Sequence, residues 1–345
     1  MKTLLLSVNQ QSLSFASELL RSGQLVAFPT ETVYGLGADA RNAKAVLSVF
    51  QAKGRPADNP LIVHIYDPSQ LEELCEVPQE ALPLMNAFWP GPLTILFQKK
   101  EAVPGEVTAG LSTVAIRMPS HPVASALLRL CKIPVAAPSA NSSGRPSPTL
   151  AAHVFEDLQG RIPLILDGGP CEVGLESTVL DICHGKPTIL RPGGITKEMI
   201  EKVLGEEVML AGSILRPLRP DEKALSPGMR YKHYAPRAAV TLVEGEEKKV
   251  LERMRDLYEK ERIQGKKACV LCFSEHMEEM NNCFPHDIGS CKHTEEIAHR
   301  LFSTLRELDE EGMEAVFSEV IPPEGIGLAV MNRLGRAAAF NIIHV

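Results

Sequence analysis

Five cationic side chains stand in turns that follow short apolar runs of the sequence, a placement typical of a pocket for a polyanion. Long side chains in tight loops punctuated by Gly and Pro are often positioned for a ligand. Ammonium and guanidinium groups bind phosphate through charge-assisted hydrogen bonds. The set therefore predicts a pocket for a nucleoside triphosphate or a nucleic-acid backbone rather than for a neutral ligand. Its members are Lys53, Arg55, Arg117, Arg145 and Arg191.

The run APSANSSGRP, residues 137–146, is dense in hydroxyl, amide and glycine groups. Such groups supply donors to phosphate oxygens, although a solvated loop has a similar composition. Arg117 closes the apolar run TVAIR, and a buried guanidinium is costly without an anionic partner. That partner is either a structural carboxylate or an anionic group of the substrate. His64, inside the apolar run PLIVHI, is by itself more typical of a core residue than of a binding one.

Other familiar sites are missing from the sequence or disfavoured by their context. The chain has no G-x-x-x-x-G-K-[ST] phosphate loop and no G-x-S-x-G nucleophile elbow. The run GLGADA at 35–40 fits a dinucleotide fingerprint, but no helix is expected to open directly after its glycines. Cys269 and Cys272 lie in a strand-like run, where side chains three residues apart point to opposite faces. A zinc site is therefore not expected there, and no metal held by protein side chains is predicted.

The elements expected to position these groups are short β-branched strands and amphipathic helices. Helical spacing of apolar residues predicts helices over 42–53, 121–132 and 149–158, with Asn42 and Thr149 as their N-caps. Strands outnumber helices in the first two hundred residues. This favours a large mixed sheet, curved over a concavity, over a regular parallel α/β repeat.

Composition is that of a globular protein with two domains. The 345 residues are 44 % apolar and 23 % charged, with a net charge of −7. The first 236 residues carry a net charge of −1 and the remainder −6, which disfavours a dedicated nucleic-acid module. No apolar run approaches the roughly 18 residues of a membrane helix, and MKTLLLSVNQQS is too short for a signal peptide. The prediction is a cytoplasmic protein without a membrane partner, whose eight cysteines stay reduced.

Residues 1–207 are predicted to form the first domain, 208–236 a linker and 237–345 the second domain. The linker is rich in proline and lacks apolar periodicity. Its end, SPGMRYKHYAP, carries aromatic and cationic residues that are typical of a contact-making segment rather than of a plain spacer. Helices expected over 246–262, 294–310 and 327–339, with strands between them, indicate a small α/β unit.

Several uncommon motifs together resemble the YrdC-like domain of threonylcarbamoyl-AMP synthases over roughly residues 10–205. They are PTETVYGLG, KGRP with NPLIVH, FWPGPLT, TVAIRMP, APSAN with SG, and ESTV with RPG. SPGMRYKHYAP and GIGLAVMNRLGRAA are similar to the linker and C-terminal domain of the long, two-domain form. The resemblance implies a twisted open mixed α/β sheet around a positively charged cavity, with a small C-terminal α/β Rossmann-like domain. It also implies that the linker folds over the active site.

The activity implied by this resemblance is that of a nucleotidyltransferase, an L-threonylcarbamoyladenylate synthase. Such an enzyme joins L-threonine, bicarbonate and ATP into threonylcarbamoyl-AMP and releases diphosphate and water. Its product supplies the downstream tRNA threonylcarbamoyl-transferase machinery, which modifies adenosine 37 in tRNAs that read codons starting with A. A weak contact with tRNA is compatible with this role.

Carried over motif by motif, the resemblance implies that Thr32, His64, Arg117 and Ser177 hold L-threonine. It implies that ATP is held by Arg55, Asn59, Thr113, Ser139, Ser147, Arg191 and Tyr231. Lys53 and Arg55 take the catalytic role of stabilising charge on the phosphates. Ser147 is matched by offset alone and Arg145 is an equal alternative, while Tyr234 lies in the same short motif as Tyr231. Mg²⁺ is expected to arrive with ATP, held by phosphate oxygens and water.

Two alternatives remain open to test. One is a carbamoyltransferase of the hydrogenase-maturation type, which forms a carbamoyl-adenylate on a YrdC-like domain but also carries further modules that this chain has no motif for. The other is a non-catalytic RNA-binding module that uses the same cationic cavity. The low net charge of the first 236 residues disfavours a broad phosphate-tracking surface.

Overall fold

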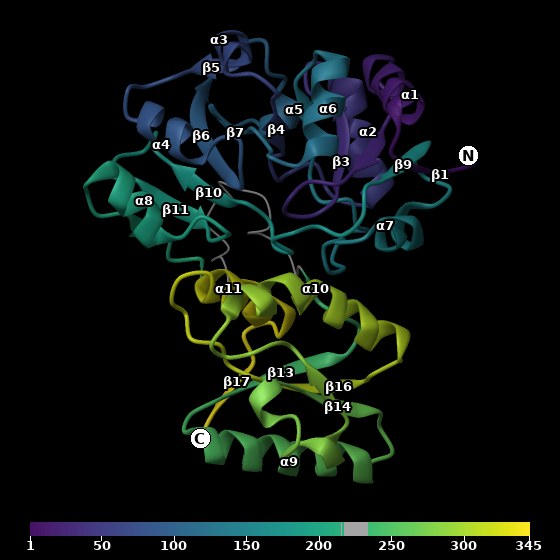
Figure 1. Cartoon of the computed structure of the whole chain (residues 1–345), viewed down its shortest axis with the longest axis vertical. Coiled ribbons are helices and arrows are strands. Elements are labelled where there is room, and N and C mark those ends of the chain that lie inside the picture. Colours follow the sequence, from purple (N-terminus) through teal and green to yellow (C-terminus); the bar gives the residue numbers. More distant parts are fainter. Residues whose placement is uncertain (215, 217–233) are drawn as a thin grey trace. The chain divides into compact units, whose positions relative to one another are not determined.

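The protein is described by a computed structural model (Figure 1) that covers residues 1–214, 216 and 234–345. Within these residues the chain forms two compact units. The first contains residues 1–143 and 147–214, and the second contains 234–345. The second unit also takes in Gly144–Pro146, although the residues on either side belong to the first. The domain boundaries expected at 207 and 237 stay predictions.

The first unit is built on a 12-stranded mixed sheet in the described residues. Its order is β1-β9-β2-β3-β8-β4-β7-β6-β10-β11-β12, with β5 paired to β6. The strands are β1 Leu4–Ser7, β2 Val26–Phe28, β3 Gly35–Asp39, β4 Ile62–His64, β5 Cys75–Glu76, β6 Leu93–Lys99, β7 Thr113–Arg117, β8 Val135–Ala136, β9 Leu164–Asp167, β10 Thr178–Asp181, β11 Thr188–Arg191 and β12 Met209–Leu210. The helices are α1 Gln10–Arg21, α2 Ala43–Lys53, α3 Leu71–Leu74, α4 Ala81–Phe88, α5 Gly105–Thr108, α6 Pro122–Cys131, α7 Ala151–Leu158 and α8 Lys197–Leu204, with a 3-10 turn η1 at Pro68–Gln70. The expectation of a large mixed sheet is confirmed.

Two of the three helices expected in the first unit begin where the sequence indicates, α2 at Ala43 and α6 at Pro122. Helix α2 is capped by Asn42, whose side chain accepts hydrogen bonds from the backbone N–H groups of Lys44 and Ala45. The N-cap assigned to Thr149 is wrong, because α7 begins at Ala151 with Leu150 as its cap residue. The backbone N–H of Thr149 instead donates to Nδ1 of His153, so this residue belongs to the preceding turn.

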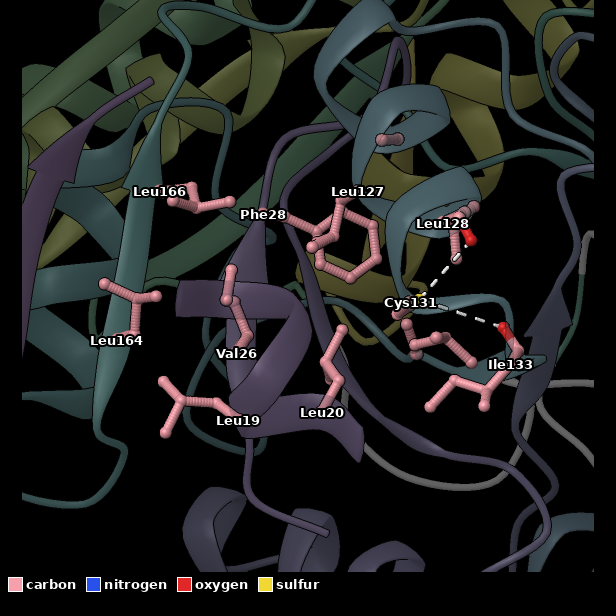
Figure 2. Packing of buried hydrophobic residues seen from close by; sticks show 14 residues of the cluster. Leu19, Leu20, Val26, Phe28, Leu127, Leu128, Cys131, Ile133, Leu164 and Leu166 are labelled. Atoms are coloured by element: carbon pink, nitrogen blue, oxygen red, sulfur yellow. Dashed lines mark hydrogen bonds between the residues drawn. The ribbon is translucent and has the colours of Figure 1, made fainter. Parts of the chain in front are cut away.

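The run GLGADA forms most of strand β3 rather than a phosphate-binding turn. A Cβ on Gly37 would lie 2.7 Å from the Phe28 ring and 2.8 Å from Val135, so this glycine allows close packing of the sheet. Phe28 and Val135 belong to a buried hydrophobic core (Figure 2), in which α1, β2, α6 and β9 meet. Leucine side chains packed there stabilise the fold by about 1.5–3 kcal/mol each relative to an exposed position.

The second unit is an all-parallel five-stranded sheet in the order β15-β14-β16-β13-β17. Helix α9 covers one face of this sheet, and α10 and α11 cover the other (Figure 1). The expected helices over 246–262, 294–310 and 327–339 are all present. The elements are β13 Ala239–Glu244, α9 Glu247–Ile263, β14 Ala268–Cys272, η2 Ser274–His276, η3 Asn281–Cys283, β15 Pro285–Asp287, α10 Thr294–Glu310, β16 Ala315–Glu319, α11 Gly327–Ala337 and β17 Ile342–His344.

Candidate active site

Arg117 is the centre of the candidate site. It ends β7, is buried, and lies opposite His64 of β4 and Thr94 of β6 in the sheet register. Its Nη1 donates to Oγ1 of Thr32 at 2.9 Å, and its Nε donates to the carbonyl of Gly91 at 3.3 Å. Arginine has five N–H donors. These two contacts orient the guanidinium and leave further N–H groups for an anion.

The anionic partner of Arg117 within the protein is Glu31, with Nη2 and Oε1 at 2.7 Å. Both side chains are buried. Burial raises the pKa of Glu31, but the charge and hydrogen bond of Arg117 outweigh that effect, and the pKa lies below its ordinary value. The sequence placed Glu31 between Thr30 and Thr32 without giving it a role. The need of Arg117 for an anionic partner was the available signal, but it did not identify which carboxylate would serve.

His64 stays neutral at physiological pH because it is buried beside a guanidinium. Burial, followed by the charge of Arg117, lowers the pKa of His64 to about 3. Its Nδ1 lies 3.2 Å from the carbonyl oxygen of Ile62. A neutral imidazole next to Arg117 can orient a substrate by hydrogen bonding, and it adds no positive charge to the site.

This depressed pKa has a consequence for stability. As the pH falls below about 6.5, the ordinary pKa of histidine, the unfolded chain takes up a proton at His64 that the folded chain refuses until about pH 3. Stability is therefore lost as the pH falls through this window. Between pH 7.5 and 5.5 we expect the wild type to lose about 1 kcal/mol more than the His64→Gln variant. Urea unfolding at both pH values measures this; equal losses in the two proteins would show that His64 is protonated when folded.

Ser177 connects the surroundings of Arg117 to a second cation, Arg191. Its hydroxyl lies 2.8 Å from Oγ1 of Thr94, the residue opposite Arg117. Arg191, at the end of β11, donates through Nε to the Ser177 carbonyl at 3.0 Å and through Nη2 to its hydroxyl at 3.1 Å. The turn after Arg191 needs glycine, because a Cβ on Gly193 would lie 2.3 Å from the Thr178 nitrogen. Thr32, His64, Arg117, Ser177 and Arg191 thus lie in one connected cluster.

Lys53 organises the hydroxyl-rich loop. It ends α2, is 3 % exposed, and its Nζ donates to the carbonyls of Ser139 and Asn141, the latter at 2.6 Å. The Ser139 hydroxyl donates to Oδ1 of Asn141 at 2.6 Å. A buried ammonium group therefore holds the loop in place. This supports the interpretation of the loop as part of a binding site rather than as a solvated loop.

Arg55, Asn59 and Thr113 lie at the opposite ends of β4 and β7 from His64 and Arg117. Arg55 is buried, and its Nη2 donates to the carbonyl of Asn59 at 3.1 Å. Continuing the parallel register of Ile62 with Ala115 puts Thr113 beside the residue that follows Asn59. Thr113 and Arg117 are the two ends of β7 and lie four residue steps apart, roughly 13 Å. The predicted ATP residues are thus spread along the sheet rather than gathered at one point.

The remaining predicted residues have separate placements. The Ser147 hydroxyl is buried and donates to Oε1 of Glu176, the residue before Ser177. Arg145 is packed in the second unit, where its Nη2 lies 3.9 Å from Oδ2 of Asp309. Tyr234 is also buried in that unit, stacked on Phe302 with ring centroids 5.3 Å apart. Tyr231 lies outside the described residues.

In the part of the chain that the structure describes, no group of three or more His, Cys, Asp or Glu side chains is arranged to hold a metal ion. Among the same residues, no helix has both the length and the apolar character to cross a bilayer.

The chain matches two family models in succession. The model described as telomere recombination matches residues 18–193. The model described as threonylcarbamoyl-AMP synthase, C-terminal domain, matches residues 195–339. Together the two matches extend over most of both compact units.

Similar proteins cover almost the whole chain. A threonylcarbamoyl-AMP synthase of Pyrococcus abyssi is 47 % identical over 98 % of this chain and 97 % of its own length. One of Bacillus subtilis is 48 % identical over 98 % and 96 %. The crystal structure of Pyrococcus abyssi Sua5 complexed with L-threonine superposes with a TM-score of 0.93 at 45 % identity, covering 99 % of this chain and all of the other.

Proposed function

Because the chain belongs to the threonylcarbamoyl-AMP synthase family, we propose that its own reaction joins L-threonine, bicarbonate and ATP into threonylcarbamoyl-AMP, with release of diphosphate and water. One observation carries the proposal to this chain's residues. Ser177 contacts Arg191 and also Thr94, the register partner of Arg117. Arg117, proposed to bind the carboxylate, and Arg191, proposed to bind phosphate, are therefore connected through Thr94 and Ser177, which supports a condensation between an amino acid and a triphosphate.

L-Threonine is proposed to lie against Arg117, with Thr32, His64 and Ser177 around it. The guanidinium binds the substrate carboxylate, while the Glu31 ion pair at 2.7 Å keeps the Arg117 side chain aligned. The amine of threonine, held as the free base, combines with CO₂ derived from bicarbonate to give a carbamate. Neutral His64 suits this step, because a second positive charge would compete with Arg117 for the carboxylate.

The carbamate oxygen then attacks the α-phosphorus of ATP, and diphosphate leaves. No side-chain nucleophile is needed. The chain aligns the two substrates, and Lys53, Arg55 and Arg191 stabilise the charge that develops on the phosphates. Asn59, Thr113, Ser139, Ser147 and Tyr231 complete the proposed ATP site. Arg145 stays the alternative to Ser147, and Tyr234 the alternative to Tyr231.

Mg²⁺ in this proposal enters with the nucleotide. The described residues bring no three metal-ligating side chains together, so they do not fit a metal site built by the protein alone. Phosphate oxygens and water would hold the ion and it would neutralise phosphate charge. The product would pass to the tRNA threonylcarbamoyl-transferase machinery in the cytoplasm, with at most a weak contact between this chain and tRNA.

Diphosphate release from the full chain tests the proposal. With ATP, Mg²⁺ and bicarbonate present, we expect release to depend on L-threonine and to be at least tenfold slower with L-serine, which lacks the methyl group. Release that depends on carbamoyl phosphate instead would favour the carbamoyltransferase alternative. Salt-dependent RNA binding without ATP turnover would favour the RNA-binding module.

A further inference from the structure

The second unit has a cavity of about 330 Å³ at the carboxyl ends of β13, β14 and β16. Its polar wall is formed by Glu244, Glu247, His276 and Glu319, and its apolar wall includes Phe273 and Val250. This volume lies at the lower end of the range of ligand pockets, roughly 300–1,000 Å³. None of these residues belongs to the site proposed above.

The cavity lies where a doubly wound sheet binds ligands. Strands β13 and β16 are neighbours in the parallel sheet. The chain leaves β13 to form α9 on one face, and it leaves β16 to form α11 on the other (Figure 1). Connections that depart to opposite faces open a crevice beyond the carboxyl ends of the strands, the common ligand position in open α/β sheets.

A buried acid–imidazole pair forms the floor of this cavity. Glu319 is 4 % exposed and accepts hydrogen bonds from the backbone N–H of Phe273 at 2.9 Å and from Nδ1 of His276 at 2.9 Å. Nε2 of His276 lies 3.7 Å from the more exposed carboxylate of Glu247. Burial lowers the pKa of His276, but the Glu319 hydrogen bond and charge outweigh this and raise it. Burial also raises the pKa of Glu319.

The charges around the cavity select against anions. Three carboxylates line the cavity: Glu319 and Glu247 lie beside His276, and Glu244 lies 2.9 Å from Nδ1 of His344. Glu246, which precedes the start of α9, lies 3.3 Å from Nζ of Lys249. A phosphate or carboxylate ligand would meet this negative field, whereas an ammonium group would lower the cost of keeping Glu319 charged in its buried position. A cation that carries an apolar group matches both the carboxylates and the apolar wall of the cavity.

We propose that this cavity binds a small organic cation, a primary ammonium group carrying a short apolar chain. The ammonium group would lie against the carboxylates of Glu319 and Glu247. The chain would pack on Phe273 and Val250, both nearly buried in the folded unit. This proposal is independent of the reaction proposed above.

Three probes of equal length test the proposal with the full chain at 150 mM salt: n-pentylamine, n-pentanol and pentanoate. Isothermal titration and saturation-transfer NMR should show binding of the amine at least tenfold tighter than of the alcohol, and no binding of pentanoate. Equal affinity for amine and alcohol would reduce the cavity to an apolar pocket and overturn the proposal. Pentanoate binding as tight as that of the amine would also overturn it.

Two glutamates of α9 provide a matched pair of variants. Glu247 lines the cavity, whereas Glu252 is exposed on the same helix and does not. Glu247→Gln should weaken pentylamine binding at least threefold, and Glu252→Gln should leave it unchanged. Equal weakening by both variants would mean attraction to an acidic surface rather than binding in the cavity. Glu319→Gln, checked for folding by circular dichroism, should abolish amine binding; retained binding in a folded variant would overturn the proposal.

Discussion

Arg117→Gln is expected to lower the free energy of unfolding at pH 7 by about 3–5 kcal/mol, because it leaves the buried Glu31 carboxylate without its cation. The variant should also lose threonine-dependent diphosphate release by at least a hundredfold. Urea unfolding and the release assay measure the two effects separately. ATP binding should remain within a few-fold of the wild type; equal loss of ATP binding would move Arg117 to the nucleotide site.

The double variant Glu31→Gln with Arg117→Gln distinguishes structure from substrate binding. Removing both charges replaces an ion pair by two neutral amides, so the part of the lost stability that came from the unpaired buried carboxylate should return. Threonine-dependent activity should not return, because no cation is left for the substrate carboxylate. Recovery of both stability and activity would show that Arg117 serves the fold alone.

Lys53→Met is expected to reduce the rate of diphosphate release by about a hundred- to a thousandfold, the loss typical of removing one electrostatic stabiliser of a transition state. The ammonium group also holds the carbonyls of Ser139 and Asn141, so the KM for ATP should rise as well. Lys44→Met, an exposed change at the other end of α2, is the matched control and should leave both parameters unchanged.

If Lys53→Met keeps the wild-type rate of diphosphate release, Arg55 and Arg191 are the residues that stabilise the charge on the phosphates. A rise in KM without a fall in the rate would restrict Lys53 to holding the loop. Thermal unfolding followed by circular dichroism should accompany both assays, since two buried carbonyls lose a donor in this variant.

The contacts of Lys53 with the 139–141 loop were not predictable, because the two lie far apart in the sequence. The need of Arg117 for an anion was predictable, because a buried guanidinium is costly without one, and the structure supplies Glu31. Which carboxylate would pair with Arg117 was not predictable. That choice depends on the loop after β2 reaching the end of β7, although three strands lie between β2 and β7 in the sheet, and sequence spacing carries no information about it.

Local patterns also failed where a turn competes with a helix. Thr149 has the side chain of an N-cap residue, but α7 begins only at Ala151. The backbone N–H of Thr149 donates to the side chain of His153, and Thr149 lies in the turn before the helix. The long helices of the second unit were predicted within two residues because their apolar periodicity runs over several turns. The cavity at the end of β16 left no such signal. Its walls come from three strands whose order in the sheet differs from their order in the chain.

The assignment of Gly144–Pro146 to the second unit limits how this protein can be dissected. The Ala235 N–H donates to the Gly144 carbonyl at 3.2 Å, and Arg306 donates to the Pro146 carbonyl at 2.6 Å. A fragment ending near residue 207 would keep the 139–147 loop but lose both donors. A fragment of this kind would therefore need new donors for these two carbonyls before its loop could be compared with that of the intact protein.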